Sequence, residues 1–144
     1  MPTTRASRKN RVFVQYAVPR RGAPSAAFLR RWARAPFSVT LRIVGEAEGR
    51  RLNRQYRKRN YAPNVLTFRY DDTSGDIVLC HPVIRREARA QGKSLAAHYA
   101  HLVVHGILHL RGYDHENKRD AARMEAREIG LLRRAGIGNP YALE

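Results

Sequence analysis

Residues 94–115 read SLAAHYAHLVVHGILHLRGYDH, and they set the architecture of the whole chain. Ser94 is a good N-cap residue, and apolar residues follow it around most of the helix circumference. A helix that is apolar on most sides is normally buried in the centre of a protein. The sequence therefore predicts a long central helix from Leu95 to about Arg111, ended by Gly112, which tolerates the positive φ of a helix C-terminus.

Three histidines in this stretch, His105, His109 and His115, have the spacing of metal ligands. His105 and His109 are four residues apart, so they share one face of a helix. His115 follows the glycine turn at a distance from which it can face the other two. Three imidazoles with a free fourth position are typical of a catalytic zinc site. The residues alone fit zinc, copper, iron or nickel.

The spacing His-x-x-x-His-x-x-Gly-x-x-His equals that of the metzincin proteases, whose signature has a glutamate directly after the first histidine. That glutamate is the general base of those enzymes, and here the position is Gly106. This residue argues against a peptidase of that type, although a metal alone can lower the pKa of bound water to about 7. Asp114 can orient the imidazole of His115 or cap the next helix, and both roles stay open.

Two further histidines, His98 and His101, extend the row along the same helix. With His105 and His109 they fall within roughly 80° on a helical wheel of about 100° per residue. Polar groups without partners in a core are unfavourable. Each of the two is therefore read as a hydrogen-bonded core histidine or as a neighbour of the metal or substrate.

The rest of the chain predicts one mixed four-stranded sheet, in an α/β fold of the α+β-like kind. Helices pack around the buried central helix that carries the metal motif. Residues 11–144 form a single domain, and residues 1–10 form a basic tail. The predicted strands are 11–18, 39–43, 64–70 and 76–80; the other predicted helices begin at Pro24-Ser25 or span 46–57, 82–90 and 118–134.

The charge is strongly positive, since 28 Lys and Arg against 12 Asp and Glu give +16. Ten of the basic residues precede the first acidic residue, Glu46. Such a field attracts polyanions, of which nucleic acid is the most abundant in a cytoplasm. The alternative is a solvated surface in an arginine-rich proteome.

Cysteine and apolar content indicate the compartment. A single cysteine, Cys80, excludes an internal disulfide, as expected of a reducing cytoplasm. No run of 18 apolar residues is present, so no membrane partner is expected. The acid-free N-terminus resembles a transit peptide in composition, but the alternation of Val12, Val14 and Tyr16 with other residues favours a strand.

Several motifs together resemble the YbeY-type endoribonucleases, also called rRNA maturation factors. The block 105–115 matches that family's His-Gly-x-Leu-His-Leu-x-Gly-Tyr-Asp-His motif. Gly75-Asp76-Ile77-Val78, Tyr56-Arg57 and the strand Asn64-Val65-Leu66-Thr67-Phe68 match further parts, and the resemblance covers roughly residues 38–141.

The resemblance implies a single-domain, metal-dependent endoribonuclease of the bacterial cytoplasm that cleaves single-stranded RNA. It implies a role in maturation of ribosomal RNA, notably at the small-subunit 3′ end, and in ribosome quality control. The ribosome or its small subunit is the implied partner, and no specificity for DNA is expected. One zinc ion on His105, His109 and His115 and a catalytic Arg57 are the implied machinery.

Two other functions are compatible with the residues. A non-catalytic RNA- or ribosome-binding protein would close its metal site with a fourth protein ligand, such as Asp114, His101 or Cys80. A metal-dependent hydrolase of small molecules or peptides is the other, but the charge of +16 and the absence of the glutamate weigh against it.

Overall fold

The computed structural model describes residues 11–112, 122, 123, 125–127 and 129–131, and its centre is one four-stranded sheet. The strand order is β1-β2-β4-β3. β1, β2 and β4 are parallel to one another, whereas β3 is antiparallel to β4. β1 and β3 are therefore the two edges, and the predicted mixed sheet is confirmed. The bounds are β1 Val12–Tyr16, β2 Ser38–Val44, β3 Val65–Asp71 and β4 Ser74–Cys80.

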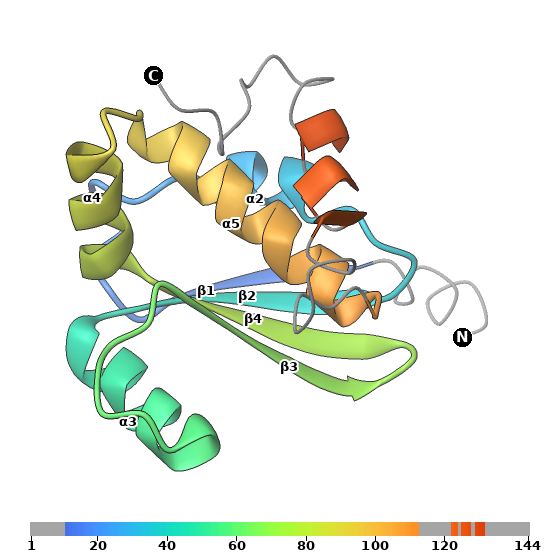
Figure 1. Cartoon of the computed structure of the whole chain (residues 1–144), viewed down its shortest axis with the longest axis horizontal. Helices are drawn as coiled ribbons and strands as arrows, with labels where there is room; N and C mark the ends of the chain where they lie inside the picture. The colour runs from blue at the N-terminus through green and yellow to red at the C-terminus, as the bar shows by residue number, and fades with distance from the viewer. Residues whose placement is uncertain (1–10, 113–121, 124, 128, 132–144) are drawn as a thin grey trace.

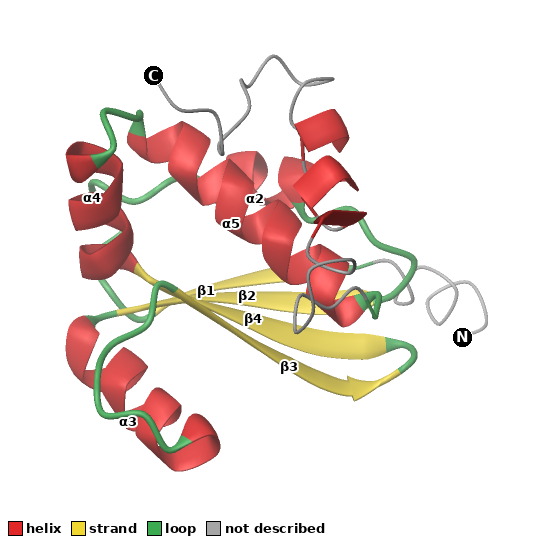
Figure 2. Ribbon diagram, in the orientation of Figure 1, coloured by secondary structure: helices red, strands yellow, loops and turns green. Residues whose placement is uncertain are grey.

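The helices divide between the two faces of the sheet (Figures 1 and 2). α2 (Ala26–Trp32) and α5 (Leu95–Leu110) cover one face, and α4 (His81–Ala90) packs beside α5. α3 (Glu46–Arg57) lies on the other face and contacts β4. In the part of the chain that the structure describes, the sheet therefore has a helical layer on one face and α3 on the other.

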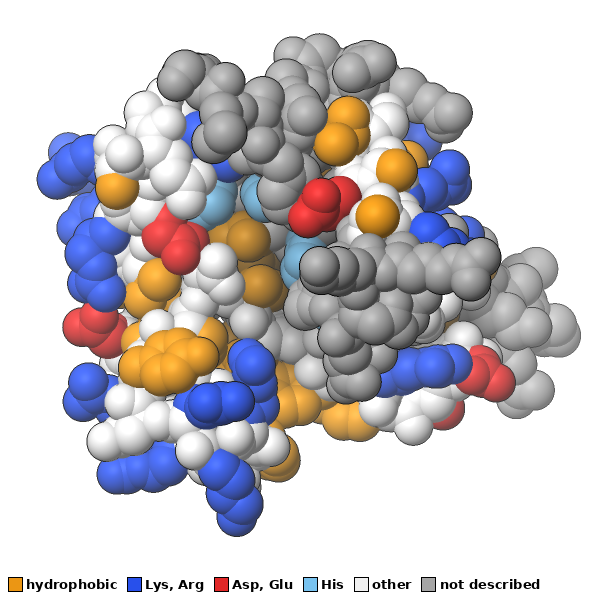
Figure 3. Space-filling view, in the orientation of Figure 1, with side chains coloured by type: hydrophobic (Ala, Val, Ile, Leu, Met, Phe, Trp, Pro, Cys, Tyr) orange, Lys and Arg blue, Asp and Glu red, His pale blue; other side chains and the backbone are white. Residues whose placement is uncertain are grey.

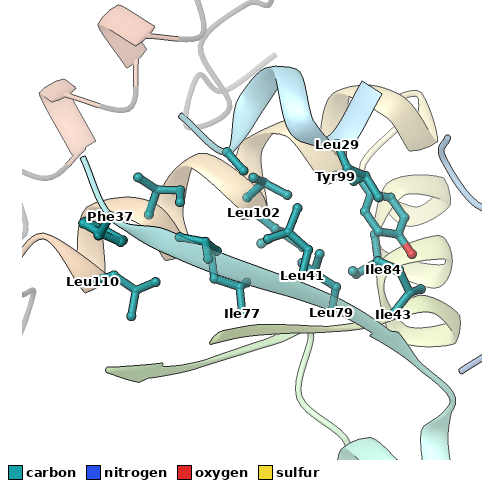
Figure 4. Close-up of a cluster of buried hydrophobic side chains, with 14 residues drawn as sticks. Leu29, Phe37, Leu41, Ile43, Ile77, Leu79, Ile84, Tyr99, Leu102 and Leu110 are labelled. Carbon is teal, nitrogen blue, oxygen red and sulfur yellow. The ribbon is translucent and has the colours of Figure 1, made fainter. Parts of the chain in front are cut away.

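Alternation along the strands separates two cores. Ile77 and Leu79 of β4 point into the main core under α2 and α5, which Figure 4 shows. Val78 and Cys80 point to the opposite face, where they pack with Leu52 of α3. Because successive side chains of a strand face opposite sides, each strand serves both layers.

The central helix α5 is buried as predicted. The hydroxyl of Ser94 accepts a hydrogen bond from the backbone N–H of Ala97 at 3.1 Å, which caps the N-terminus. Ten of the sixteen residues of the helix are buried. Gly112 follows the helix with a φ of +97°, as its glycine predicts.

Element bounds differ from the predicted ones by a few residues. β4 begins at Ser74 rather than at Asp76, because Ser74 and Gly75 also pair with β2. α4 begins at His81, so Pro82 lies in its first turn, where a proline is well tolerated. The predicted basic tail, 1–10, and most of the predicted last helix, 118–134, lie outside the described residues. Within the part that is described, no helix is long and apolar enough to cross a membrane.

Candidate metal centre

The two predicted ligands on α5 face each other across one turn of helix. The Nε2 atoms of His105 and His109 are 3.1 Å apart. A tetrahedral zinc ion with Zn–N bonds of about 2.0–2.1 Å keeps two nitrogen ligands about 3.3 Å apart. The imidazole pair therefore fits such an ion with little movement. The third predicted ligand, His115, lies outside the described residues, which contain no group of three metal-binding side chains.

Arg57 lies in the same pocket as this histidine pair. The pocket has a volume of about 670 Å³, and its wall includes Arg57, His105 and His109. Arg57 is the last residue of α3, which ends there because Lys58 adopts a left-handed backbone with φ 60°. Arg57 makes no ion pair within the described residues. Its guanidinium is therefore available to a phosphate.

Strand β3 forms the remaining wall of the pocket. Because β3 is an edge strand, residues from opposite faces of the sheet can meet beside it. Residues 64–70 all line the pocket, so it lies along the outer edge of the sheet. α5 approaches this edge from one face and the end of α3 from the other. Figure 3 shows histidine side chains at the centre of this side of the molecule and Lys and Arg side chains gathered over α3.

Gly106 is enclosed against the sheet. A Cβ atom at this position would lie 2.8 Å from Cδ1 of Ile77 and 3.1 Å from its Cγ2. Ile77 is fully buried and faces the main core. A glutamate here would therefore enter the packed interior. The structure thus gives a packing reason for the absence of the protease base, in addition to the sequence difference.

Of the two additional histidines, His98 is a core residue with a hydrogen-bond partner. Only 3% of its surface is exposed, and its Nε2 lies 2.8 Å from Oε1 of Glu87 on α4. Since a carboxylate only accepts, Nε2 carries the proton. Burial lowers the pKa of His98, and Glu87 opposes part of that effect. His101 lies between the rings of His98 and His105, 6.0 and 6.3 Å away between centroids.

Glu87 was not among the predicted functional residues, yet it joins three elements. Its carboxylate accepts from His98 of α5 and, at 3.1 and 3.3 Å, from Nδ2 of Asn64 at the start of β3. Asn64 lines the pocket. A signal existed in the sequence, since Glu87 is the only acidic residue between Asp76 and Asp114. A lone carboxylate near a row of histidines is a natural partner for one of them.

The other candidate groups lie elsewhere. Cys80 faces the α3 side of the sheet, opposite to α5, and its thiol is 3.6 Å from the carbonyl oxygen of Gly45. It is therefore wrong as a fourth ligand to the histidines of α5. His81, to which the sequence assigned no role, has its Nδ1 2.6 Å from the hydroxyl of Tyr99. Asp114 lies outside the described residues.

Comparisons with known proteins agree on one family. The family model described as endoribonuclease YbeY matches residues 25–136. A protein of that name from Aromatoleum aromaticum is 51% identical over an alignment of 150 positions, which covers 97% of each chain. Another, from Methylibium petroleiphilum, is 55% identical over 119 residues, covering 78% of this chain and 80% of the relative.

One solved structure supports the fold alone. A solution structure of a Thermotoga maritima protein has a TM-score of 0.53 to this chain at 22% sequence identity. It covers 92% of this chain and 99% of its own.

Proposed function

Because the chain belongs to the YbeY endoribonuclease family, we propose that it is a metal-dependent endoribonuclease that cleaves single-stranded RNA. One observation carries the proposal at the level of the site. His105, His109 and Arg57 come from elements on opposite faces of the sheet and line a single pocket. The charge of +16 suits a polyanionic substrate.

Each side chain has a distinct role in this proposal. His105 and His109, together with His115, would hold one zinc ion through neutral imidazole nitrogens. When bound, such an ion supplies a Lewis acid for the phosphate and an acidic water molecule. Arg57 binds a phosphate through paired N–H donors and neutralises the charge that develops on its oxygens.

The supporting shell keeps these groups in place. Gly106 lets α5 lie directly on β4, which fixes the height of the histidine pair above the sheet. Glu87 connects α5 with the start of β3 through His98 and Asn64, so one pocket wall is tied to the helix of the ligands. Such supporting contacts hold reactive groups to the accuracy that catalysis requires.

The biological setting forms part of the same proposal. We place the activity in the bacterial cytoplasm, on ribosomal RNA, with maturation of the small-subunit 3′ end and ribosome quality control as the processes. The small ribosomal subunit is the proposed partner. The support is the family relationship together with the basic character of the chain.

Two single substitutions test the machinery. His109→Ala should remove bound zinc, measured by elemental analysis of the purified protein, and should abolish cleavage of a single-stranded RNA oligomer. Arg57→Ala should keep both zinc and fold but lower the rate of cleavage. Arg54→Ala is the matched control, because Arg54 is an exposed arginine of the same helix that does not line the pocket.

The outcomes separate the parts of the proposal. Unchanged zinc content in His109→Ala would refute the ligand assignment. Equal cleavage by Arg57→Ala and Arg54→Ala would remove Arg57 from the mechanism. Basic proteins carry host ribonucleases through purification, so cleavage that persists after all three histidines are replaced is contamination and would leave the chain without the proposed activity.

A further inference from the structure

Two tyrosines in the wall of the pocket are unusually open to solvent. Tyr56 is 59% exposed and Tyr70 is 65% exposed, and both line the pocket that holds Arg57 and the histidine pair. Within the described part of the chain, four large hydrophobic side chains are exposed, and two of them are in this one pocket. Exposed aromatic side chains grouped in a charged cleft are typical of a ligand-binding surface.

The ring of Tyr56 is held in place from one side. Tyr56 lies in the last turn of α3, directly before Arg57. Its ring packs edge-on against Phe68 of β3, with centroids 5.1 Å apart and planes at 73°. Edge-to-face pairs of this kind are favourable beyond the area that they bury. The ring is therefore oriented by Phe68, while more than half of its surface is open to the pocket and solvent.

Tyr70 is held by its hydroxyl instead. The hydroxyl donates a hydrogen bond to Oδ2 of Asp76 at 2.6 Å. This bond, aided by burial, raises the pKa of Tyr70 to about 12, and the neighbouring Tyr56 adds to the effect. The phenol therefore stays neutral at cellular pH and does not repel a phosphate. As with Tyr56, one part of the side chain is anchored and the rest is open.

The charges around the two rings also suit a nucleotide chain. Arg69, on β3, forms an exposed ion pair with Asp72. The carboxylate of Asp76 accepts from Tyr70. Arg57 is left as a cation without an ion-pair partner among the described residues of the pocket. A phosphate bound by Arg57 would therefore lie in the same pocket as the rings of Tyr56 and Tyr70.

We propose that Tyr56 and Tyr70 form a nucleobase-binding site, on which two unpaired bases of the RNA stack while the phosphate near them binds Arg57. This inference rests on the proposed endoribonuclease function and specifies how its substrate is chosen. In a duplex the bases already stack on one another and are not open to a protein ring. A requirement for two free bases therefore selects single-stranded RNA without reading its sequence.

Binding of RNA oligomers to tyrosine variants tests this site. Tyr56→Leu and Tyr70→Leu should each raise the Kd for a single-stranded oligomer by about 5- to 150-fold, the effect of losing one stacked base. Tyr56→Phe keeps the ring and should bind within about twofold of the unchanged protein. Tyr61→Leu is the matched control, because Tyr61 is 50% exposed but does not line the pocket.

A second measurement separates stacking from a merely structural role. Oligomers with one abasic position, moved along the strand, should bind the unchanged protein more weakly at two positions. At one of these the penalty should disappear in Tyr56→Leu, and at the other in Tyr70→Leu. Fluorescence anisotropy gives the Kd when it is read within the short time in which a gel shows that the oligomer has not yet been cleaved. Zinc content and circular dichroism show that the variants are folded.

Leucine variants that bind like Tyr61→Leu, or abasic penalties that are the same in all variants, would show that no base stacks on these rings. Failure of the proposed function gives a different result, because the unchanged protein would then bind RNA without cleaving it. Whether the abasic penalty disappears in the matching tyrosine variant tests the stacking site, whether or not the protein cleaves RNA.

Discussion

Replacement of Gly106 by alanine provides a test of how closely the ligand helix must lie on the sheet. An alanine Cβ would lie 2.8 Å from Cδ1, 3.1 Å from Cγ2 and 3.2 Å from Cγ1 of Ile77. Contacts below 3.0 Å do not occur without movement, and Ile77 is fully buried, so it has no free space to turn into. Overpacking of a core destabilises by about 1–3 kcal/mol. Alanine in place of glycine in a helix gains about 1 kcal/mol, so we expect a net loss of about 1 kcal/mol.

A double-mutant cycle with Ile77→Val tests whether Ile77 is the side chain that an added Cβ at position 106 would contact. This substitution removes Cδ1, the closest atom, and alone costs about 0.5–1.5 kcal/mol. The double variant should lose less free energy of unfolding than the two single variants lose together, by a coupling energy of about 0.5–1.5 kcal/mol. Gly130→Ala is the control, since its added methyl meets no described atom within 4 Å and should stabilise by up to about 1 kcal/mol.

Urea unfolding followed by circular dichroism measures the free energy of unfolding of the two single variants, the double variant and Gly130→Ala. Two results would refute the close-packing argument. One is a gain of stability in Gly106→Ala as large as that in Gly130→Ala. The other is strict additivity between Gly106→Ala and Ile77→Val. Gly106→Glu should fail to fold, because an unpaired carboxylate would enter the core.

Three further predictions concern the supporting shell. Glu87→Ala should lower the free energy of unfolding by about 1–3 kcal/mol, because the buried His98 and the side chain of Asn64 lose their shared acceptor. Glu87→Gln should lose less, and urea titration of both variants checks this. Because the pKa of His98 is lowered in the folded protein, only the unfolded chain gains a proton at this residue as the pH falls below about 6.5. The free energy of unfolding should therefore decrease from pH 7.5 to 5.5, and more steeply than in His98→Gln. An equal pH dependence in the two proteins would exclude His98 as the cause of the decrease. Ser94→Ala should cost about 1 kcal/mol through loss of the cap on Ala97, with thermal melts as the measurement, and an unchanged melting temperature would contradict the capping role.

Much of the fold could be predicted because local pattern and global packing agree in α5. Its apolar residues on most sides require burial, and Ser94 and Gly112 mark its two ends. The strands followed from alternation and from turn residues. Their spatial order did not, since β4 lies between β2 and β3 in the sheet but follows both in the chain. Periodicity identifies a strand but not its neighbour.

For the candidate site too, local patterns could be predicted from the sequence, but contacts between separate elements could not. His105 and His109 lie on one face because of helical periodicity alone. Arg57 was assigned to the site by family resemblance, and no sequence pattern indicates that the end of α3 and the C-terminal half of α5 meet at one sheet edge. Glu87 went unrecognised because its partner His98 is on a different helix. Such contacts depend on how two helices pack, which neither sequence segment contains.

The position of β3 also affects the solubility of the protein. Among the described residues β3 pairs with β4 only, so its outer edge has backbone N–H and C=O groups to which none of these residues adds a strand. Exposed edges of this kind recruit strands from other molecules and promote aggregation, and positive side chains beside them oppose it. Arg57 and Arg69 border this edge through the pocket. We therefore expect the arginines that suit an RNA ligand also to oppose self-association of the free protein, and variants that remove them should be compared at equal, low concentration.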